Sequence, residues 1–208
     1  MNNDATIVGA IGDARSADMA HEVLERGGVT VLPTDTLYGL SARISAEEGI
    51  RRISAIKRAP NDRRYILLAS SIDMLDRFVR SYGCASREML AAAWPAPLSV
   101  IVPSGPACPP WVGPTVAVRV PALPPLCALI ERLGEPIVST SVNRTGSAPL
   151  DDAHEIRHEM GAEVDLILTG LSDERMASTI VDLSGDVPRV VRRGSYAWAA
   201  TGDSKPSK

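Results

Sequence analysis

Residues 29–40 read VTVLPTDTLYGL and join an apolar segment to a polar one. Residues 29–32 are predicted to form a buried strand, because β-branched and apolar side chains follow one another without interruption. Residues 33–40 then gather hydroxyl groups, an aspartate and a glycine, which predicts a loop. The loop is either a turn stabilised by its own side chains or a ligand-binding edge, since open α/β sheets bind ligands at the carboxyl ends of their strands.

Helices are predicted on both sides of this strand. Residues 17–26 place apolar side chains on one helical face, with Ser16 as the N-cap and two glycines as the stop. Residues 45–48, SAEE, have the form of a capping box, and the apolar stripe that follows predicts a helix with Lys57 at its C-terminal end.

The rest of the chain mixes both kinds of element. Strands are predicted at 65–69, 98–102, 116–120, 137–139, 166–169, 179–183 and 189–191, and helices at 72–80, 87–93, 126–133 and 152–160. This mixture predicts an α/β or α+β sheet packed on helices. Because no linker or internal repeat divides the chain, we expect one domain over residues 1–200 and a disordered tail over 201–208.

Composition and charge exclude several classes of protein. Only 4% of the 208 residues are aromatic, which argues against a base-stacking platform, and the net charge of −3 gives no overall attraction to nucleic acid or anionic membranes. The pattern of a signal peptide is missing, as is an apolar run of the ~18 residues that a membrane helix needs. The three cysteines lack paired spacing, which predicts buried, reduced thiols at Cys84, Cys108 and Cys127. We therefore expect a cytoplasmic protein without membrane contact.

Cations cluster directly after the second predicted helix, at Lys57, Arg58, Arg63 and Arg64. Such cations can simply complement the helix dipole at the surface. They can also clamp a triphosphate, because Arg offers paired donors and Lys a mobile point charge to phosphate oxygens.

Arg119 is unusual because it lies inside the otherwise apolar strand 116–120. A charge buried there needs a partner. That partner is either a carboxylate of the chain, in a structural ion pair, or the carboxylate of a ligand.

Polar groups also follow other predicted strands. Residues 139–146 combine hydroxyl, amide and guanidinium groups, Ser178 and Thr179 begin a strand, and Arg192 ends one. Several polar strand ends in one domain indicate a shared cleft rather than unrelated turns.

Residues 154–158, HEIRH, match the zinc-hydrolase pattern H-E-x-x-H. No histidine follows His158 to supply a third imidazole, and the segment is highly charged. We therefore predict a solvated helix and no bound metal, and keep a zinc hydrolase as a remote alternative. The chain has neither a Walker loop nor a G-x-G-x-x-G motif, so a nucleotide would be held by side chains and loop amides.

Taken in order, seven segments resemble the YrdC-like family of threonylcarbamoyl-adenylate synthases over nearly the whole chain. They are LPTDTLYGL at 32–40, IKRAP at 56–60, WPAPLS at 94–99, TVAVRVP at 115–121, STSVN at 139–143, STIVD at 178–182 and RRG at 192–194. The resemblance implies a twisted, mixed β-sheet with flanking helices around a large, positively lined cleft. It also implies that L-threonine, bicarbonate and ATP are converted to threonylcarbamoyl-adenylate, pyrophosphate and water, for modification of adenosine 37 of tRNA by partner proteins.

The resemblance also implies roles for individual residues. L-threonine would be held by Thr36, Arg119, Ser139 and Ser178, with Arg119 on its carboxylate. ATP, with Mg²⁺ on its phosphates, would be held by Lys57, Arg63, Thr115, Ser141, Asn143 and Arg192. Lys57 and Arg58 would be the catalytic cations, acting by positioning and electrostatics, because no residue stands out as a covalent nucleophile or general base.

Three positions depart from the family pattern. Ala59 stands where the family has an arginine, with Arg58 one place earlier, while Ala96 and Pro149 replace a glycine and a polar residue. Two alternatives therefore stay open. One is a paralogue without synthase activity, and the other is a module that uses the cleft to bind tRNA or double-stranded RNA, which the basic cluster favours and the net charge opposes.

Overall fold

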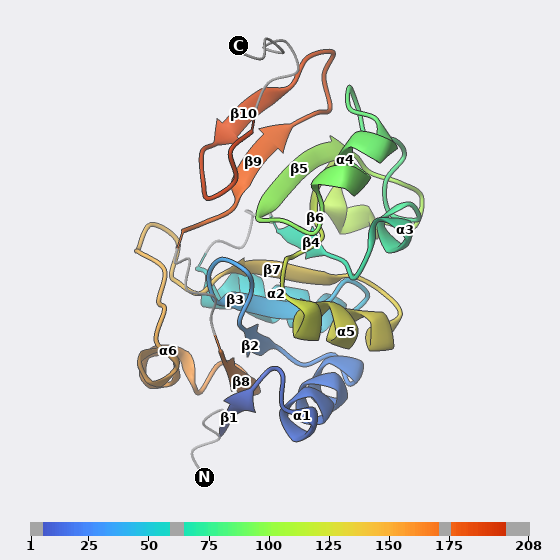
Figure 1. Cartoon of the computed structure of the whole chain (residues 1–208). Coiled ribbons are helices and arrows are strands. Elements are labelled where there is room, and N and C mark those ends of the chain that lie inside the picture. The colour runs from blue at the N-terminus through green and yellow to red at the C-terminus, as the bar shows by residue number, and fades with distance from the viewer. Residues whose placement is uncertain (1–5, 59–64, 171–175, 199–208) are drawn as a thin grey trace, which may run out of the picture.

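The apolar strands form the centre of one mixed sheet in the computed structural model, which describes residues 6–58, 65–170 and 176–198 (Figure 1). The strands follow the order β1-β8-β2-β3-β7-β4-β6-β5-β9-β10. Their bounds are β1 Thr6–Ala10, β2 Thr30–Leu32, β3 Gly39–Arg43, β4 Ile66–Leu68, β5 Leu98–Pro103, β6 Thr115–Arg119, β7 Ile137–Ser141, β8 Leu166–Thr169, β9 Thr179–Asp182 and β10 Arg189–Arg192.

The sheet combines parallel and antiparallel strand pairs. β2 pairs antiparallel to β3 and β3 to β7, whereas β8 runs parallel to both β1 and β2. β4 lies antiparallel to β7 and parallel to β6, and β5 lies antiparallel to β6 and parallel to β9. The sheet is therefore mixed, as the sequence predicts.

Helices cover both faces of the sheet. Their bounds are α1 Ala14–Glu25, α2 Glu47–Ile56, α3 Ile72–Leu75, α4 Arg87–Ala93, α5 Pro124–Leu133 and α6 Ala153–Met160. α1 and α5 lie side by side and share one core with Leu32, Leu68 and Leu166, while α2 and α6 belong to a second core that contains Val31 and Ile167 (Figure 1). Neighbouring strand residues thus enter opposite cores, which explains why these strands are apolar without alternation.

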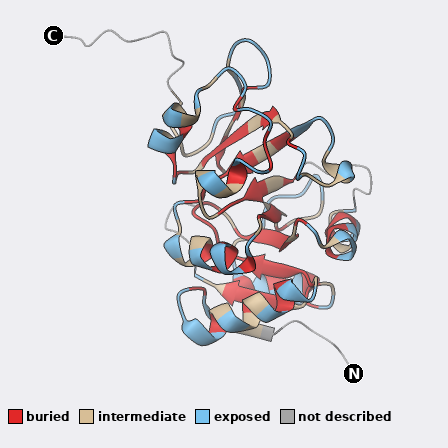
Figure 2. Ribbon diagram, turned by 90° about the vertical axis from the view of Figure 1, so that its right-hand side faces the viewer, coloured by how far each residue is buried: buried red, intermediate tan, exposed pale blue. Residues whose placement is uncertain are grey.

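Strands and helices differ in how far they are buried (Figure 2). The strands are largely buried, and the helices expose one face to solvent. Among the described residues, no helix combines the length and apolar character needed to cross a bilayer.

Every predicted strand is present, but the sequence missed two others. β1 was not anticipated, and residues 33–40 are not wholly a loop, because β3 begins at Gly39. A Cβ at Gly39 would clash with Ser139 Oγ, so any larger residue there would force the Ser139 side chain to move.

Both predicted helix starts need correction. The first helix begins at Ala14, where the Asp13 side chain, not Ser16, is the cap and accepts from the Ser16 N–H at 2.9 Å. The capping box at 45–48 is not formed: Ala46 is the N-cap, and Ser45 Oγ instead donates to Glu135 Oε1 at 2.5 Å. In each case a carboxylate, that of Asp13 or of Glu135, bonds to the serine that was expected to cap the helix.

Three further expectations have different outcomes. The helix predicted at 72–80 stops at Leu75: the Phe78 N–H donates to the Leu75 carbonyl at 2.7 Å in a tighter turn, and Val79 then forms an isolated β-bridge with Ser104. All three thiols are free, but Cys84 is exposed and the other two are half-buried, so the expectation of buried cysteines was wrong. The tail predicted at 201–208 lies outside the described residues.

Candidate functional site

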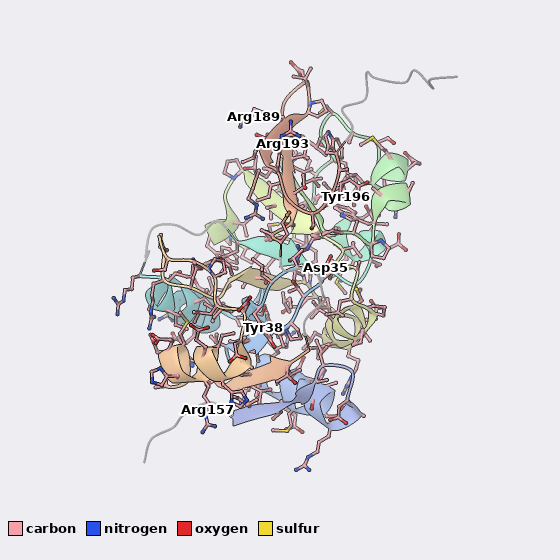
Figure 3. The ribbon with its side chains drawn as sticks, turned by 60° about the vertical axis from the view of Figure 1, so that its left-hand side comes forward. Asp35, Tyr38, Arg157, Arg189, Arg193 and Tyr196 are labelled. Carbon is pink, nitrogen blue, oxygen red and sulfur yellow. The ribbon has the colours of Figure 1, made fainter. Side chains whose placement is uncertain are left out.

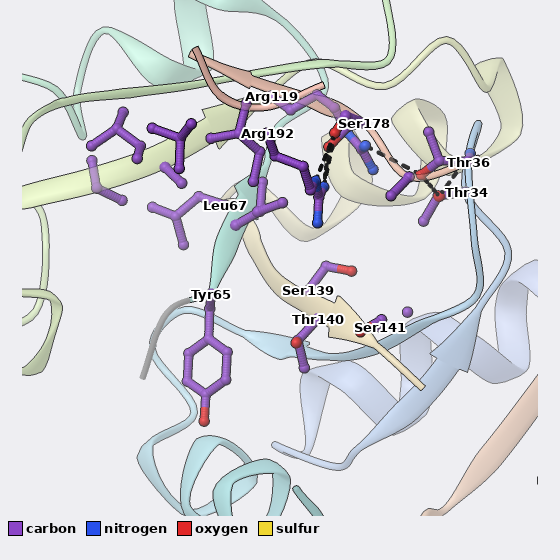
Figure 4. Close-up of a pocket in the computed structure, with 18 of the residues that line it drawn as sticks. Thr34, Thr36, Tyr65, Leu67, Arg119, Ser139, Thr140, Ser141, Ser178 and Arg192 are labelled. Carbon is purple, nitrogen blue, oxygen red and sulfur yellow. Dashed lines mark hydrogen bonds between the residues drawn. The ribbon is translucent and has the colours of Figure 1, made fainter. Parts of the chain in front are cut away.

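A pocket of about 530 Å³ opens where the predicted polar strand ends meet. Its lining comes from the loop after β2 and from β4, β6, β7, β9 and β10, and one wall carries the hydroxyl groups of Ser139, Thr140 and Ser141 (Figure 4). This volume is in the range of ~300–1,000 Å³ typical of small-molecule sites. The shared cleft that the sequence predicts is therefore present.

Most of the predicted site residues reach this pocket. The lining includes Thr36, Arg119, Ser139, Ser178, Thr115, Ser141 and Arg192. Lys57 and Asn143 adjoin it through hydrogen bonds to the lining residue Ser141. Arg58 is not among the described lining residues, and Arg63 lies outside the described part of the chain.

Arg119 is the charge at the centre of the site. Its side chain is 4% exposed, its Nη1 donates to Thr36 Oγ1 at 3.3 Å, and its Nη2 lies 3.4 Å from Asp35 Oδ1. The Nε has no hydrogen-bond partner among the described residues. A structural ion pair with Asp35 therefore exists, but it is longer than a charge-assisted hydrogen bond of ~2.8 Å. The guanidinium is left with capacity for a further anion.

Asp35 was not predicted as a site residue. It is buried in the interior of the molecule (Figure 3), and its Oδ2 accepts from the Ala122 N–H at 3.0 Å. Asp35 therefore links the loop after β2 to the segment after β6. The only signal in the sequence was an aspartate next to a predicted strand, and that signal does not identify its partner.

A second guanidinium, of Arg192, enters from β10. Its Nε and Nη2 donate to the Ser178 carbonyl at 3.0 and 2.9 Å, and Nη2 also donates to Ser178 Oγ at 3.1 Å. Among the described residues no carboxylate pairs with Arg192. Burial lowers the pKa of Arg119, as does the nearby charge of Arg192, while Asp35 opposes the shift. Two close cations with one carboxylate form a site for an anion.

The loop after β2 is stabilised by its own side chains. Thr34 Oγ1 donates to the Leu37 carbonyl at 2.7 Å and accepts from the Thr36 N–H at 3.1 Å. Thr34 and Thr36 also line the pocket (Figure 4). The loop is therefore a turn stabilised by its own side chains, and the same bonds fix the hydroxyl groups that face the pocket.

Lys57 lies at the C-terminal end of α2. Its ammonium donates to the Ser141 carbonyl at 2.9 Å and to Asn143 Oδ1, which also accepts from Ser141 Oγ at 2.9 Å. These bonds bring a predicted ATP-binding cation beside the end of β7. Lys57, Ser141 and Asn143 therefore form one connected group.

Arg58 is exposed and adopts a left-handed backbone conformation, with φ of 53°. The sequence predicts a severe loss of ATP use in Arg58→Ala if this guanidinium reaches the phosphates, and almost none if it points to solvent. Because Arg58 is exposed, we expect the variant to lose less than about threefold in kcat/KM for ATP, since exposed charges contribute weakly. Steady-state kinetics of Arg58→Ala beside Lys57→Ala measure this. A comparable loss in both variants would show that Arg58 is the second phosphate cation.

The HEIRH segment forms α6, which is solvated as predicted. Ala153, Ile156 and Met160 are buried, whereas His154 and His158 are exposed, and Arg157 points outward (Figure 3). The described residues contain no group of three or more side chains suited to a metal. This helix supports the domain without facing the pocket.

We expect His158→Ala to keep near wild-type activity and the purified protein to carry no stoichiometric zinc. Metal analysis and a pyrophosphate-release assay test both points. One tightly bound zinc per chain, lost in His158→Ala together with activity, would contradict the assignment.

An aromatic wall was also missed by sequence reasoning. Tyr65 and Trp111 line the pocket and meet edge to face with ring centroids 6.1 Å apart, and Tyr65 Oη lies 2.6 Å from Ser54 Oγ. Trp111 lies in a short 3₁₀ turn, Pro110–Val112, inside a proline-rich loop without periodicity. No pattern in the sequence could assign it to the pocket.

Comparison with known proteins identifies this arrangement. Residues 22–194 match the family model Sua5_yciO_yrdC, which carries the description Telomere recombination. The chain belongs to the Sua5/YciO/YrdC family. The resemblance found in the sequence is thereby confirmed.

Individual members of the Sua5/YciO/YrdC family agree. The threonylcarbamoyl-AMP synthase of Cellvibrio japonicus is 32% identical over 82% of this chain and 93% of its own length. The crystal structure of E. coli YciO is 29% identical, has a TM-score of 0.82, and covers 92% of this chain and 96% of its own. P. abyssi Sua5 complexed with L-threonine is 28% identical with a TM-score of 0.82, over 91% of this chain and 58% of its own. These structures confirm the predicted fold class, a mixed α/β sheet with flanking helices.

Proposed function

We propose that this chain is an L-threonylcarbamoyl-adenylate synthase. The proposal rests on two guanidinium groups, of Arg119 and Arg192, which line the pocket together with a wall of hydroxyl groups. This combination suits an amino-acid carboxylate beside a nucleotide. The C. japonicus relative bears the name of this activity, and P. abyssi Sua5 has been solved with L-threonine. The family and the chemistry of the pocket therefore support the same reaction.

The reaction joins three anionic or polar reactants without a covalent enzyme intermediate. The threonine amino group attacks bicarbonate, and loss of water gives a carbamate. A carbamate oxygen then attacks the α-phosphorus of ATP, and pyrophosphate leaves. The protein must hold the reactants in line and stabilise the charge that develops on the phosphoryl oxygens.

Threonine would bind at the buried end of the pocket. Arg119 would pair with its carboxylate, and Thr36, Ser139 and Ser178 would meet its other polar atoms. Arg192, already bonded to Ser178, would lie between the amino acid and the nucleotide. Its position there would help bring the carbamate to the α-phosphorus.

ATP would lie across the end of β7 and the start of β6. Lys57, Thr115, Ser141 and Asn143 supply a cation, hydroxyls and an amide, with Arg63 from outside the described residues. The described residues offer no carboxylate cluster, so Mg²⁺ would be bound mainly by phosphates and water, with these oxygens available near it. When bound, Mg²⁺ would neutralise phosphate charge.

The product would pass to partner proteins that complete the modification of adenosine 37 in tRNA. These partners belong to the proposal, as does the cytoplasmic location where ATP and tRNA occur together. Any contact with RNA would be local, because the net charge of −3 provides no general attraction.

The decisive experiment is pyrophosphate release with each reactant omitted in turn. Wild-type protein with threonine, bicarbonate and ATP should release pyrophosphate, and omission of threonine or bicarbonate should abolish the signal. Release that is independent of threonine, or none in a folded protein that binds ATP, would contradict the proposal. The second result would indicate the paralogue without synthase activity.

A further inference from the structure

Arg144 reaches from the segment after β7 to the end of α2. Its Nη1 donates to the Ile56 carbonyl at 2.5 Å, and the N–H of the next residue, Thr145, donates to the Lys57 carbonyl at 3.0 Å. The last carbonyls of a helix have no N–H partner within the helix. The segment after β7 therefore satisfies two such carbonyls, that of Ile56 and that of Lys57 itself.

Glu163 holds the Arg144 guanidinium in this position. Its carboxylate accepts from Arg144 at both oxygens, with Nη1 at 3.1 Å from Oε2 and Nη2 bonded to Oε1. The Glu163 carbonyl in turn accepts from Arg52, a residue of α2, at 3.0 Å. The hydrogen bond to Glu163 is the main cause of the raised pKa of Arg144. Arg144 is therefore anchored to the same helix that it caps.

Arg144 brings a positive charge to the C-terminal end of α2, where the ammonium of the C-cap residue Lys57 is bonded to Ser141 and Asn143. α2 has no basic residue in its last turn, although cations are favourable at a helix C-terminus. Arg144 provides that charge and also follows Asn143, which binds the Lys57 ammonium. The backbone and the side chain of Lys57 are thus held by the same short segment.

We propose that Arg144 is a positioning residue, which with Glu163 forms a clasp that holds Lys57 against Ser141 and Asn143. The direction of the Lys57 ammonium is set by this clasp. The inference rests on the proposed function only in naming ATP phosphates as the group that Lys57 faces. Arg144 itself does not line the pocket.

Selective labelling of lysine tests the clasp without turnover. The chain has three lysines, Lys57, Lys205 and Lys208, so acylation at Lys57 can be followed by peptide mass spectrometry with the other two as internal references. Arg144→Ala should raise the labelling rate at Lys57 by about three- to tenfold, because a charged hydrogen-bond anchor is lost. The KM for ATP should rise by a similar factor, while the KM for threonine stays unchanged.

Arg43→Ala is the matched control. Arg43 has a side-chain exposure of 21%, against 24% for Arg144, and it also pairs with glutamates, Glu25 and Glu135. Because it lies away from Lys57 contacts, its loss should change neither Lys57 labelling nor the KM for ATP. Arg144→Lys, which keeps the charge, should restore part of the wild-type behaviour.

Wild-type labelling of Lys57 in folded Arg144→Ala would overturn the clasp, as would an equal increase in Arg43→Ala. Should Arg144→Ala not fold, Glu163→Gln weakens the anchor while preserving its shape and should raise labelling less, but in the same direction. Unchanged labelling in that variant would again overturn the clasp. Failure of wild-type protein to release pyrophosphate would refute the proposed function and leave the labelling result valid.

Discussion

Arg119→Ala is expected to raise the KM for threonine by about ten- to a hundredfold, because it removes a charge-assisted pair worth ~1.5–3 kcal/mol. The KM for ATP should change far less, since the Arg119 guanidinium bonds to Thr36 and lies beside Asp35 rather than near Lys57. Pyrophosphate release at varied threonine and at varied ATP measures both constants.

The substitution also removes the cation nearest the buried Asp35 carboxylate, and a broken buried pair costs about 3–5 kcal/mol of folding stability. The double variant Asp35→Asn/Arg119→Gln removes both charges of the pair, so it leaves no buried charge without its partner. It is the comparison for the stability of Arg119→Ala. Thermal unfolding of each variant separates loss of structure from loss of binding. A folded variant that keeps the wild-type KM for threonine would show that Arg119 serves only as the ion-pair partner of Asp35.

Lys57→Ala is expected to lower kcat/KM for ATP by about 10²- to 10³-fold, the range seen when one preorganised donor to a developing charge is removed. The cation is the only described lysine and is bonded to Asn143 and to Ser141, which lines the pocket. Direct binding of ATP and single-turnover release of pyrophosphate together divide the loss between binding and chemistry.

Lys57→Arg is the appropriate comparison, because it keeps the charge but cannot present it as a compact ammonium. It should retain part of the activity. Threonine binding should be nearly unchanged in both variants. If Lys57→Ala stays within about threefold of wild type, the phosphate-binding role fails, since effects of that size are ordinary for exposed charges.

The sequence predicted the central strands well, because both of their faces are buried and their apolar runs are continuous. β3 was missed because it begins at Gly39 and contains Ser41, so neither alternation nor β-branched residues mark it. Its strand conformation comes from pairing with β2 and β7, which only the folded chain provides. The lost capping box has a similar cause, since Ser45 bonds to a glutamate 90 positions away.

The site, like the fold, could be predicted only in part from the sequence. Hydroxyl groups and cations at strand ends could be predicted to meet, because sheet geometry brings strand ends together. The partners of Arg119 and Lys57 could not be predicted, since Asp35 is 84 residues away from Arg119 along the chain and Asn143 is 86 residues away from Lys57. Their roles depend on distances that exist only in the folded protein.

The closeness of Arg119 and Arg192 has a consequence for how long the protein persists. Burial and the nearby charge of Arg192 both disfavour the Arg119 cation, and an anion that binds beside Arg119 offsets both effects. Mass action then makes the folded population depend on ligand concentration. Threonine, which pairs with Arg119 under the proposed function, would therefore stabilise the folded protein and reduce the unfolded fraction open to proteolysis.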